Sequence, residues 1–167
     1  REFIGMGLGA AASTAMPGLA GAAVTRRGIA FDRVLNAVDD LGMDPTGEEP
    51  IDDILRDHWT DGTLIEFPPG TYMRHDNLDF GSIRHRGLVG LGDHRNDVEI
   101  TSPAYGEPGY RDNHIFLRVS GGSGLLLENY TLQQGSDHDG RHSGHTVLIN
   151  DDFKMIDVEL GGFNPIE

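Results

Sequence analysis

The sequence contains no cysteine and, among its 167 residues, a single lysine, Lys154. The absence of cysteine excludes disulfide bonds, thiolate catalysis and zinc–thiolate sites within this chain. Aromatic residues make up only 7% of the chain, whereas 24 residues are glycine. Because glycine adopts the positive φ angles that tight corners need, this composition favours short strands joined by many turns over a helical bundle.

The charge is strongly one-sided. The chain has 27 acidic and 13 basic residues, which gives a formal net charge of -14 at pH 7. A field of this sign repels nucleic acid and anionic lipid, so we expect neither as a partner. Arginine in place of lysine, together with many aspartates, is typical of halophilic proteins, in which high ionic strength screens self-repulsion. An ordinary acidic exported protein is the alternative.

Residues 1–23 have the pattern of an export signal. Arg1, Phe3, Ile4 and Gly5 precede a weakly apolar run that is rich in glycine and alanine and ends in small residues. The Arg-x-Phe-Ile-Gly segment resembles the second half of a twin-arginine (Tat) signal peptide. A retained anchor is the alternative, but the run is only marginally apolar for spanning hydrocarbon. We therefore expect export to the cell surface or the medium, without stable membrane insertion after signal cleavage.

Residues 24–62 are predicted to form a linker and two short capping helices. The first helix covers residues 34–41, where apolar side chains recur at helical spacing. The second begins at Pro50 and places Ile51, Ile54, Leu55 and His58 on one face. Trp59 follows this face and is predicted to be a packing residue rather than a sugar-stacking platform.

From residue 63 to residue 167 the pattern changes to short apolar runs separated by Gly, Asp, Asn or Pro. It predicts β-strands at 64–67, 78–80, 88–91, 98–100, 115–119, 125–127, 130–132, 147–149 and 155–158. Residues 114–132 resemble residues 145–160 at an offset of roughly 28 to 31 residues, about one coil of a β-solenoid. A β-sandwich also has short strands with turn signals and stays open as an alternative.

The sequence Phe67-Pro68-Pro69-Gly70-Thr71-Tyr72, preceded by the turn at residues 39–47 and the predicted helix, resembles the N-terminal entry of the pectate-lyase-like superfamily. The two prolines end ladder pairing after Phe67, and Gly70 permits a corner. The resemblance covers roughly residues 38–162. It implies an all-β fold, a right-handed parallel β-helix with short N-terminal capping helices, whose coils continue beyond residue 167.

Candidate catalytic residues gather in the polar segment 135–145. Asp137 and Asp139 place two carboxylates in one loop, an arrangement that Ca²⁺ favours, so Ca²⁺ is the predicted cofactor. His145 is a candidate base in the same segment. The resemblance to the pectate-lyase-like superfamily implies an arginine base, for which Arg141 is the candidate. A solvated loop on an acidic surface is the structural alternative.

Asp151 and Asp152 form a second candidate pair. Adjacent residues of a strand face opposite sides, so these carboxylates converge only where a turn or bulge re-aims one of them. A turn whose carboxylates bind their own backbone is the alternative. The loop at residues 102–113 is long for a connection between strands, and such loops are either one wall of a groove or only spacers.

Together these features predict an exported carbohydrate-active protein that acts on a polysaccharide or a cell-surface glycan, as a lyase or a glycoside hydrolase. The alternative is a non-catalytic surface, adhesion or structural protein, since one fold serves many functions. An enzyme must bring two carboxylates, or a carboxylate and a cation, to one glycosidic bond, whereas a rigid rod needs only soluble loops.

Overall fold

The computed structural model describes residues 23–76, 78–104, 106–108, 117–133, 146–147 and 151–161. These residues form mostly β-strands, with one α-helix and one short 3-10 helix. The elements, in chain order, are β1 (Val24–Arg26), β2 (Ile29–Phe31), β3 (Arg33–Asn36), β4 (Thr46–Pro50), α1 (Asp52–His58), β5 (Thr63–Phe67), β6 (Gly70–Met73), β7 (Leu78–Asp79), β8 (Ser82–Gly90), η1 (Arg95–Asp97), β9 (Val98–Thr101), β10 (Leu117–Val119), β11 (Gly121–Gln133), β12 (Thr146–Val147) and β13 (Asp151–Gly161).

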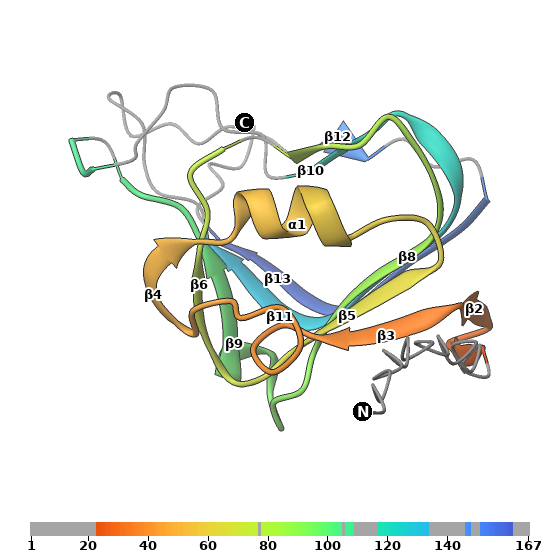
Figure 1. Ribbon diagram of the computed structural model, residues 1–167, viewed down its shortest axis with the longest axis horizontal. Coiled ribbons are helices and arrows are strands. Elements are labelled where there is room, and N and C mark those ends of the chain that lie inside the picture. Colours follow the sequence, from red (N-terminus) through yellow and green to blue (C-terminus); the bar gives the residue numbers. More distant parts are fainter. Residues whose placement is uncertain are drawn as a thin grey trace, which may run out of the picture.

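Most strands join into one curved sheet with the order β3-β5-β8-β11-β9-β6-β4, and β13 pairs with β11 as well. All of these pairings are parallel. The long strand β11 connects the two halves, because its first part pairs with β8 and its last residues pair with β9. Figure 1 shows the sheet as a half-barrel with α1 lying on its concave side. Strands β7, β10 and β12 form a separate three-stranded parallel sheet.

The predicted right-handed parallel β-helix is wrong, although the predicted all-β composition agrees with the strands. The main sheet is one continuous parallel half-barrel rather than a clear solenoid of separate faces. The physical reason lies in β11, where Gly124 and Asn129 take φ values of 72° and 57°. These two residues, in the left-handed backbone conformation, bend β11, while its pairing with the neighbouring strands continues before and after each bend. The sheet therefore curves, and the strand does not end at a turn. The β-sandwich alternative also fails, because it requires facing antiparallel sheets.

The strand register agrees with the lower value of the predicted offset of 28 to 31 residues. Arg118 pairs with Thr146 and Leu125 pairs with Phe153, which in both pairs is an offset of 28 residues. The parallel pairing of similar segments therefore places like residues in rows across the sheet. This offset alone does not specify a solenoid.

Both predicted helices need correction. Residues 34–41 form strand β3 and a turn, because the side-chain oxygen of Asn36 accepts the backbone N–H groups of Val38 and Asp39 at 2.9 and 3.0 Å. Such an Asn side chain favours a turn over a helix. Pro50 ends strand β4 rather than starting a helix, and α1 follows with Asp52 and Asp53 in its first turn. Acidic residues there complement the positive end of the helix dipole.

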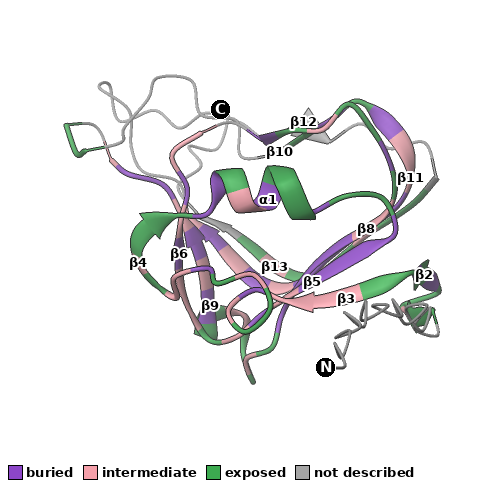
Figure 2. Cartoon of the chain, in the orientation of Figure 1, coloured by how far each residue is buried: buried purple, intermediate pink, exposed green. Residues whose placement is uncertain are grey.

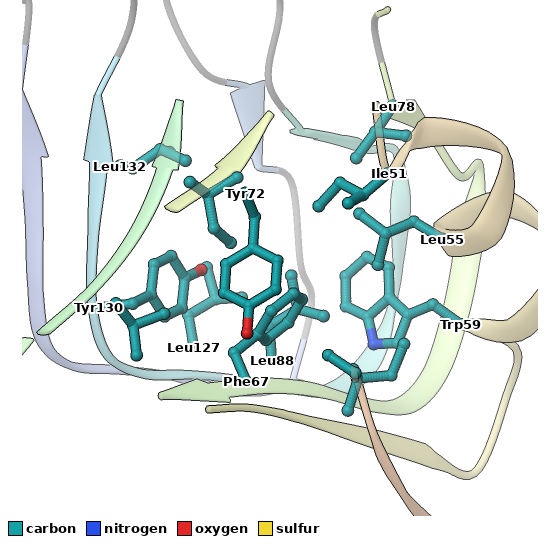
Figure 3. Close-up of a cluster of buried hydrophobic side chains, with 14 of the residues drawn as sticks. Ile51, Leu55, Trp59, Phe67, Tyr72, Leu78, Leu88, Leu127, Tyr130 and Leu132 are labelled. Carbon is teal, nitrogen blue, oxygen red and sulfur yellow. The ribbon is translucent and has the colours of Figure 1, made fainter. Parts of the chain in front are cut away.

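The core lies between α1 and the concave face of the sheet. Figure 3 shows Ile51, Leu55 and Trp59 of the α1 segment facing this core, and all three are fully buried. The indole N–H of Trp59 donates to the carbonyl of Gly87 at 3.0 Å, and its ring meets the Phe80 ring edge-on at 4.9 Å between centroids. The prediction that Trp59 is a packing residue is confirmed. His58, by contrast, is exposed, so its predicted place on the apolar face is wrong.

A second, smaller core lies on the convex side, beneath the β1–β2 hairpin. Ile29 and Phe31 of β2 pack with Leu64, Val89 and Leu126 from three neighbouring strands of the sheet. Figure 2 shows buried segments on the interior strands of the sheet, whereas the described residues of β3, β4 and β13 are intermediate or exposed. Among the described residues, no helix is both long enough and apolar enough to cross a membrane.

Candidate functional site

Most of the site residues predicted from the sequence lie outside the described residues: Asp137, Asp139, Arg141 and His145. Asp151 begins β13 opposite Ser123, but its side chain is also outside the described set. Asp152 is exposed, has a φ of 52°, and lies 3.9 Å from the ammonium group of Lys154. The convergence of the Asp151 and Asp152 carboxylates and the Ca²⁺ loop therefore both stay predictions.

A different site is formed beside strands β4 and β6. A hollow with a volume of about 320 Å³ is lined by Gly47, Glu48, Met73, His75, Pro103, Glu107 and Pro108. We name it the Glu48–Glu107 pocket. Strand β6 pairs with β4 on one side and with β9 on the other, so the pocket draws its two glutamates from opposite sides of β6. Glu48 belongs to β4, and Glu107 lies in the loop that follows β9.

Glu48 reaches the pocket because β4 carries a bulge. Thr46 pairs with Thr71 and Pro50 with Met73, so four residue steps on β4 oppose two on β6. Gly47 takes a φ of 79° within this irregular stretch, a conformation that glycine adopts without steric cost. Bulges of this kind re-aim side chains at the edges of sheets.

Asp44 holds the bulge in place. Its carboxylate accepts hydrogen bonds from the backbone N–H groups of Thr46, Glu48 and Glu49 at 3.0, 2.7 and 3.1 Å, and from the Thr46 hydroxyl at 2.8 Å. Donation by the Thr46 backbone and hydroxyl, followed by the Glu49 and Glu48 backbones, lowers the pKa of Asp44 to about 2. Asp44 is therefore ionised at any pH near neutrality and fixes the backbone beneath Glu48.

The end of β6 forms the floor of the pocket. Side chains alternate along an extended strand, so Met73 and His75 line the pocket while Tyr72 and Arg74 are buried on the other side. Burial raises the pKa of Tyr72 to about 12, with a smaller contribution from the charge of Asp44. Burial lowers the pKa of Arg74 to about 10, and the nearby charge of Asp52 opposes this change, so Arg74 stays cationic near neutral pH.

The backbone of His75 is fixed by α1. The buried carboxylate of Asp52 accepts the N–H groups of His75 and of Asp76 at 2.7 and 3.0 Å. The N–H of Ile51 also donates to the carbonyl of Met73 at 2.8 Å. The start of the helix and the end of β6 are therefore one rigid unit, and the imidazole of His75 is presented from a fixed backbone.

The remaining wall is a tight turn in the loop after β9. The carboxylate of Glu107 accepts the N–H of Ala104 at 2.8 Å, and the N–H of Glu107 donates to the carbonyl of Ala104 at 3.0 Å. One carboxylate oxygen is thus used in the turn, and no hydrogen bond from a described residue reaches the other. Pro103 and Pro108 flank this turn and add apolar surface to the wall.

The site offers hydrogen-bond acceptors above an apolar floor. Two carboxylates and an imidazole can bind hydroxyl groups or move a proton, and Met73 with the two prolines can contact C–H surface. In the described part of the chain, no three His, Asp or Glu side chains are arranged to hold a metal ion. The carboxylates, the imidazole and the apolar surface together suit a polar organic ligand.

Sequence reasoning identified one wall of this site and missed the other. The long loop at residues 102–113 was predicted as either a groove wall or a spacer, and its described part does line the pocket. Glu48 was missed, because it comes two residues before Pro50, where a helix was predicted to begin. The signal for the bulge was present in Asp44-Pro45-Thr46-Gly47, because an Asp two residues before Thr or Ser caps a tight turn and the following Gly supplies positive φ.

Comparison with known proteins gives no family. No family model, no curated protein and no solved structure matches this chain. The resemblance to the pectate-lyase-like superfamily stays a prediction carried by a few sequence motifs.

Proposed function

We propose that this chain binds a neutral saccharide unit of a polysaccharide or cell-surface glycan in the Glu48–Glu107 pocket. The observation that carries the proposal is the pair of carboxylates held on either side of β6, above the apolar surface of Met73 and the prolines. Sugar hydroxyls donate to carboxylates and imidazole, and the C–H faces of a sugar ring pack on apolar side chains.

The size and charge of the pocket restrict the class of ligand that can bind. A volume of about 320 Å³ lies at the small end of ligand sites, which suits one sugar ring rather than a long chain segment. The chain carries a net charge of -14, and two of its acidic groups line the pocket. Uronate-containing polysaccharides would be repelled, so a neutral or amino sugar fits better than the acidic substrates that lyases cleave.

Glycoside hydrolysis is the second candidate, favoured by the same two carboxylates. A hydrolase needs one carboxylic acid to protonate the leaving oxygen and one carboxylate to act as base or nucleophile. Glu48 and Glu107 are the residues that would take these roles. Binding without cleavage would instead fit the surface or adhesion protein that the sequence left open.

The test is a binding titration of neutral oligosaccharides by calorimetry in high salt, which screens the protein's self-repulsion. Glu48→Gln and Glu107→Gln should each weaken binding by roughly tenfold, because each removes a charge-assisted hydrogen bond. The control, Glu49→Gln, makes the same change in charge one residue away and outside the pocket lining. Equal affinity for all four proteins would refute the proposal. If the natural chain releases new reducing ends from an oligosaccharide and neither pocket variant does, the chain hydrolyses glycosidic bonds.

A further inference from the structure

His75 lies in the lining of the Glu48–Glu107 pocket just past the end of strand β6. The last pairing of that strand joins Met73 to Thr101 of β9, and the N–H of Arg74 still donates to the carbonyl of Thr101 at 2.9 Å. Beyond this point, none of the strands in the described ranges pairs with residues 75–76. The sheet therefore does not fix the backbone of His75.

Side chains hold these two residues instead. One carboxylate oxygen of Asp52 accepts the N–H of His75 at 2.7 Å, and the other accepts the N–H of Asp76 at 3.0 Å. Arg74 donates from Nη1 to the carbonyl of Asp76 at 3.2 Å, and Arg56 donates from Nη2 to its carboxylate at 3.1 Å. Asp52 thus binds both backbone N–H groups that follow the end of the strand.

Asp52 is itself held in place by the core. It is 4% exposed and is the first residue of α1. Ile51, Leu55 and Trp59 of the same segment are fully buried against the sheet, as Figure 3 shows. Since packed core side chains leave little room for displacement, the Asp52 carboxylate is a fixed point to which the backbone of His75 is bonded.

The buried carboxylate of Asp52 is not part of the pocket lining, so it does not contact a ligand there. Any effect of Asp52 on a ligand must therefore pass through His75. A carboxylate has an acceptor at both oxygens, whereas the amide of an asparagine has one acceptor and one N–H₂ donor. Asp52→Asn thus keeps the size of the side chain and breaks one of the two hydrogen bonds that hold residues 75–76.

We infer that Asp52 is a positioning residue for saccharide binding: it sets the affinity of the Glu48–Glu107 pocket by fixing the backbone that presents the His75 imidazole. The inference rests on the proposed function of the pocket and adds to it a residue that the ligand does not touch. It also gives α1 a role in binding besides core packing, because the helix that covers the core holds the floor of the pocket.

The test is a double-mutant cycle, in which calorimetry measures the binding of a neutral oligosaccharide in high salt to the natural chain, Asp52→Asn, His75→Ala and the double variant. Circular dichroism sets a temperature at which all four are folded. We expect Asp52→Asn to weaken binding roughly fivefold and His75→Ala roughly tenfold, because each loses or misplaces one hydrogen bond to the ligand. The double variant should bind no more weakly than His75→Ala, since without the imidazole Asp52 has nothing left to position.

Two control variants separate positioning from changes in charge and in stability. Asp53→Asn makes the same change in charge one residue along, on an exposed side chain. Glu128→Gln removes a buried ion pair on the convex face of the sheet. Both should bind the oligosaccharide with natural affinity. The NMR signal of the His75 ring, identified by its loss in His75→Ala, should shift in Asp52→Asn and stay in place in both controls.

Three results would overturn the inference alone, with Glu48→Gln still weakening binding and the proposed function intact. They are natural affinity in Asp52→Asn, an equal fold loss from Asp52→Asn with and without His75, and a loss in Glu128→Gln as large as that in Asp52→Asn. If the natural chain binds no neutral oligosaccharide, the proposed function and the inference both fail.

Discussion

Arg27 donates two hydrogen bonds to one carboxylate oxygen of Glu128, from Nε at 2.9 Å and from Nη2 at 2.5 Å. Arg26 donates to the other oxygen at 2.8 Å, and the Glu128 side chain is only 7% exposed. The two arginines belong to the β1–β2 hairpin segment, while Glu128 lies in β11, so this pairing ties the hairpin to the convex face of the sheet.

Removing the charge of Glu128 should loosen that hairpin. Because both arginines are partly exposed, we expect Glu128→Gln to lower the free energy of unfolding by about 1–3 kcal/mol, less than for a fully buried pair. Urea unfolding measures this change. The comparison is Glu66→Gln, since Glu66 makes one contact with Arg26 at 3.2 Å. An equal loss in both variants would contradict the role given to Glu128.

Asp44 should make the protein sensitive to acid. Its pKa is about 2 in the folded chain against an ordinary value of 3.8, so its contribution to stability is complete above the ordinary value and is lost as pH falls from about 4 toward 2. In Asp44→Asn, stability should therefore fall less steeply with pH in this window. Thermal unfolding between pH 5 and pH 2 tests this expectation. Asp57→Asn, on the exposed side of α1, should keep the natural slope.

Asp52 should matter more than its neighbour Asp53. Asp52→Asn keeps one oxygen acceptor but turns an amide N–H₂ toward a backbone N–H of His75 or Asp76, so we expect a loss of about 2 kcal/mol. Asp53 is 93% exposed and pairs with Arg56 on the surface, so Asp53→Asn should change stability by less than about 0.5 kcal/mol. Denaturant midpoints compare the two. A similar small effect for both would mean that the helix does not fix His75.

Gly90 should tolerate no side chain. A Cβ at this position would overlap the backbone oxygen of Asn129. The side-chain amide of Asn129 also donates hydrogen bonds to the carbonyls of Gly90 and Gly92, at 3.1 and 2.8 Å. We expect Gly90→Ala to destabilise by about 3 kcal/mol. Gly42→Ala meets no atom within 4 Å and suffers only left-handed backbone strain, about 1 kcal/mol. Urea unfolding measures both losses. A larger loss of unfolding free energy in Gly42→Ala than in Gly90→Ala would contradict the close approach of β8 and β11.

The strands were the most predictable part of the fold. The runs at 64–67 and 98–100 lie within β5 and β9, and the runs at 125–127 and 130–132 lie within the single strand β11. Local apolar patterning determines these strands. What it could not determine is whether Gly124 and Asn129 end a strand or bend it, because the same residues favour both outcomes and only pairing with the neighbours decides.

The candidate site was less predictable for a different reason. Glu48 and Glu107 are far apart in the sequence and meet only because β6 pairs with both β4 and β9. Strand β4 has no apolar alternation, since it reads Thr-Gly-Glu-Glu-Pro, and is held by Asp44 rather than by burial. The helix expected at residues 34–41 failed in the same way, because the side chain of Asn36 ends the segment locally.

The location of saccharide binding is the most direct test of the proposed function. Amide chemical shifts of the isotopically labelled chain, recorded while a neutral oligosaccharide is added in high salt, report which residues meet the ligand. We expect changes at Gly47, Glu48, Met73, His75 and Glu107, and smaller changes at the same residues in Glu48→Gln at an equal ligand concentration below saturation. Shifts confined to other parts of the chain, or none at saturating ligand, would contradict the account.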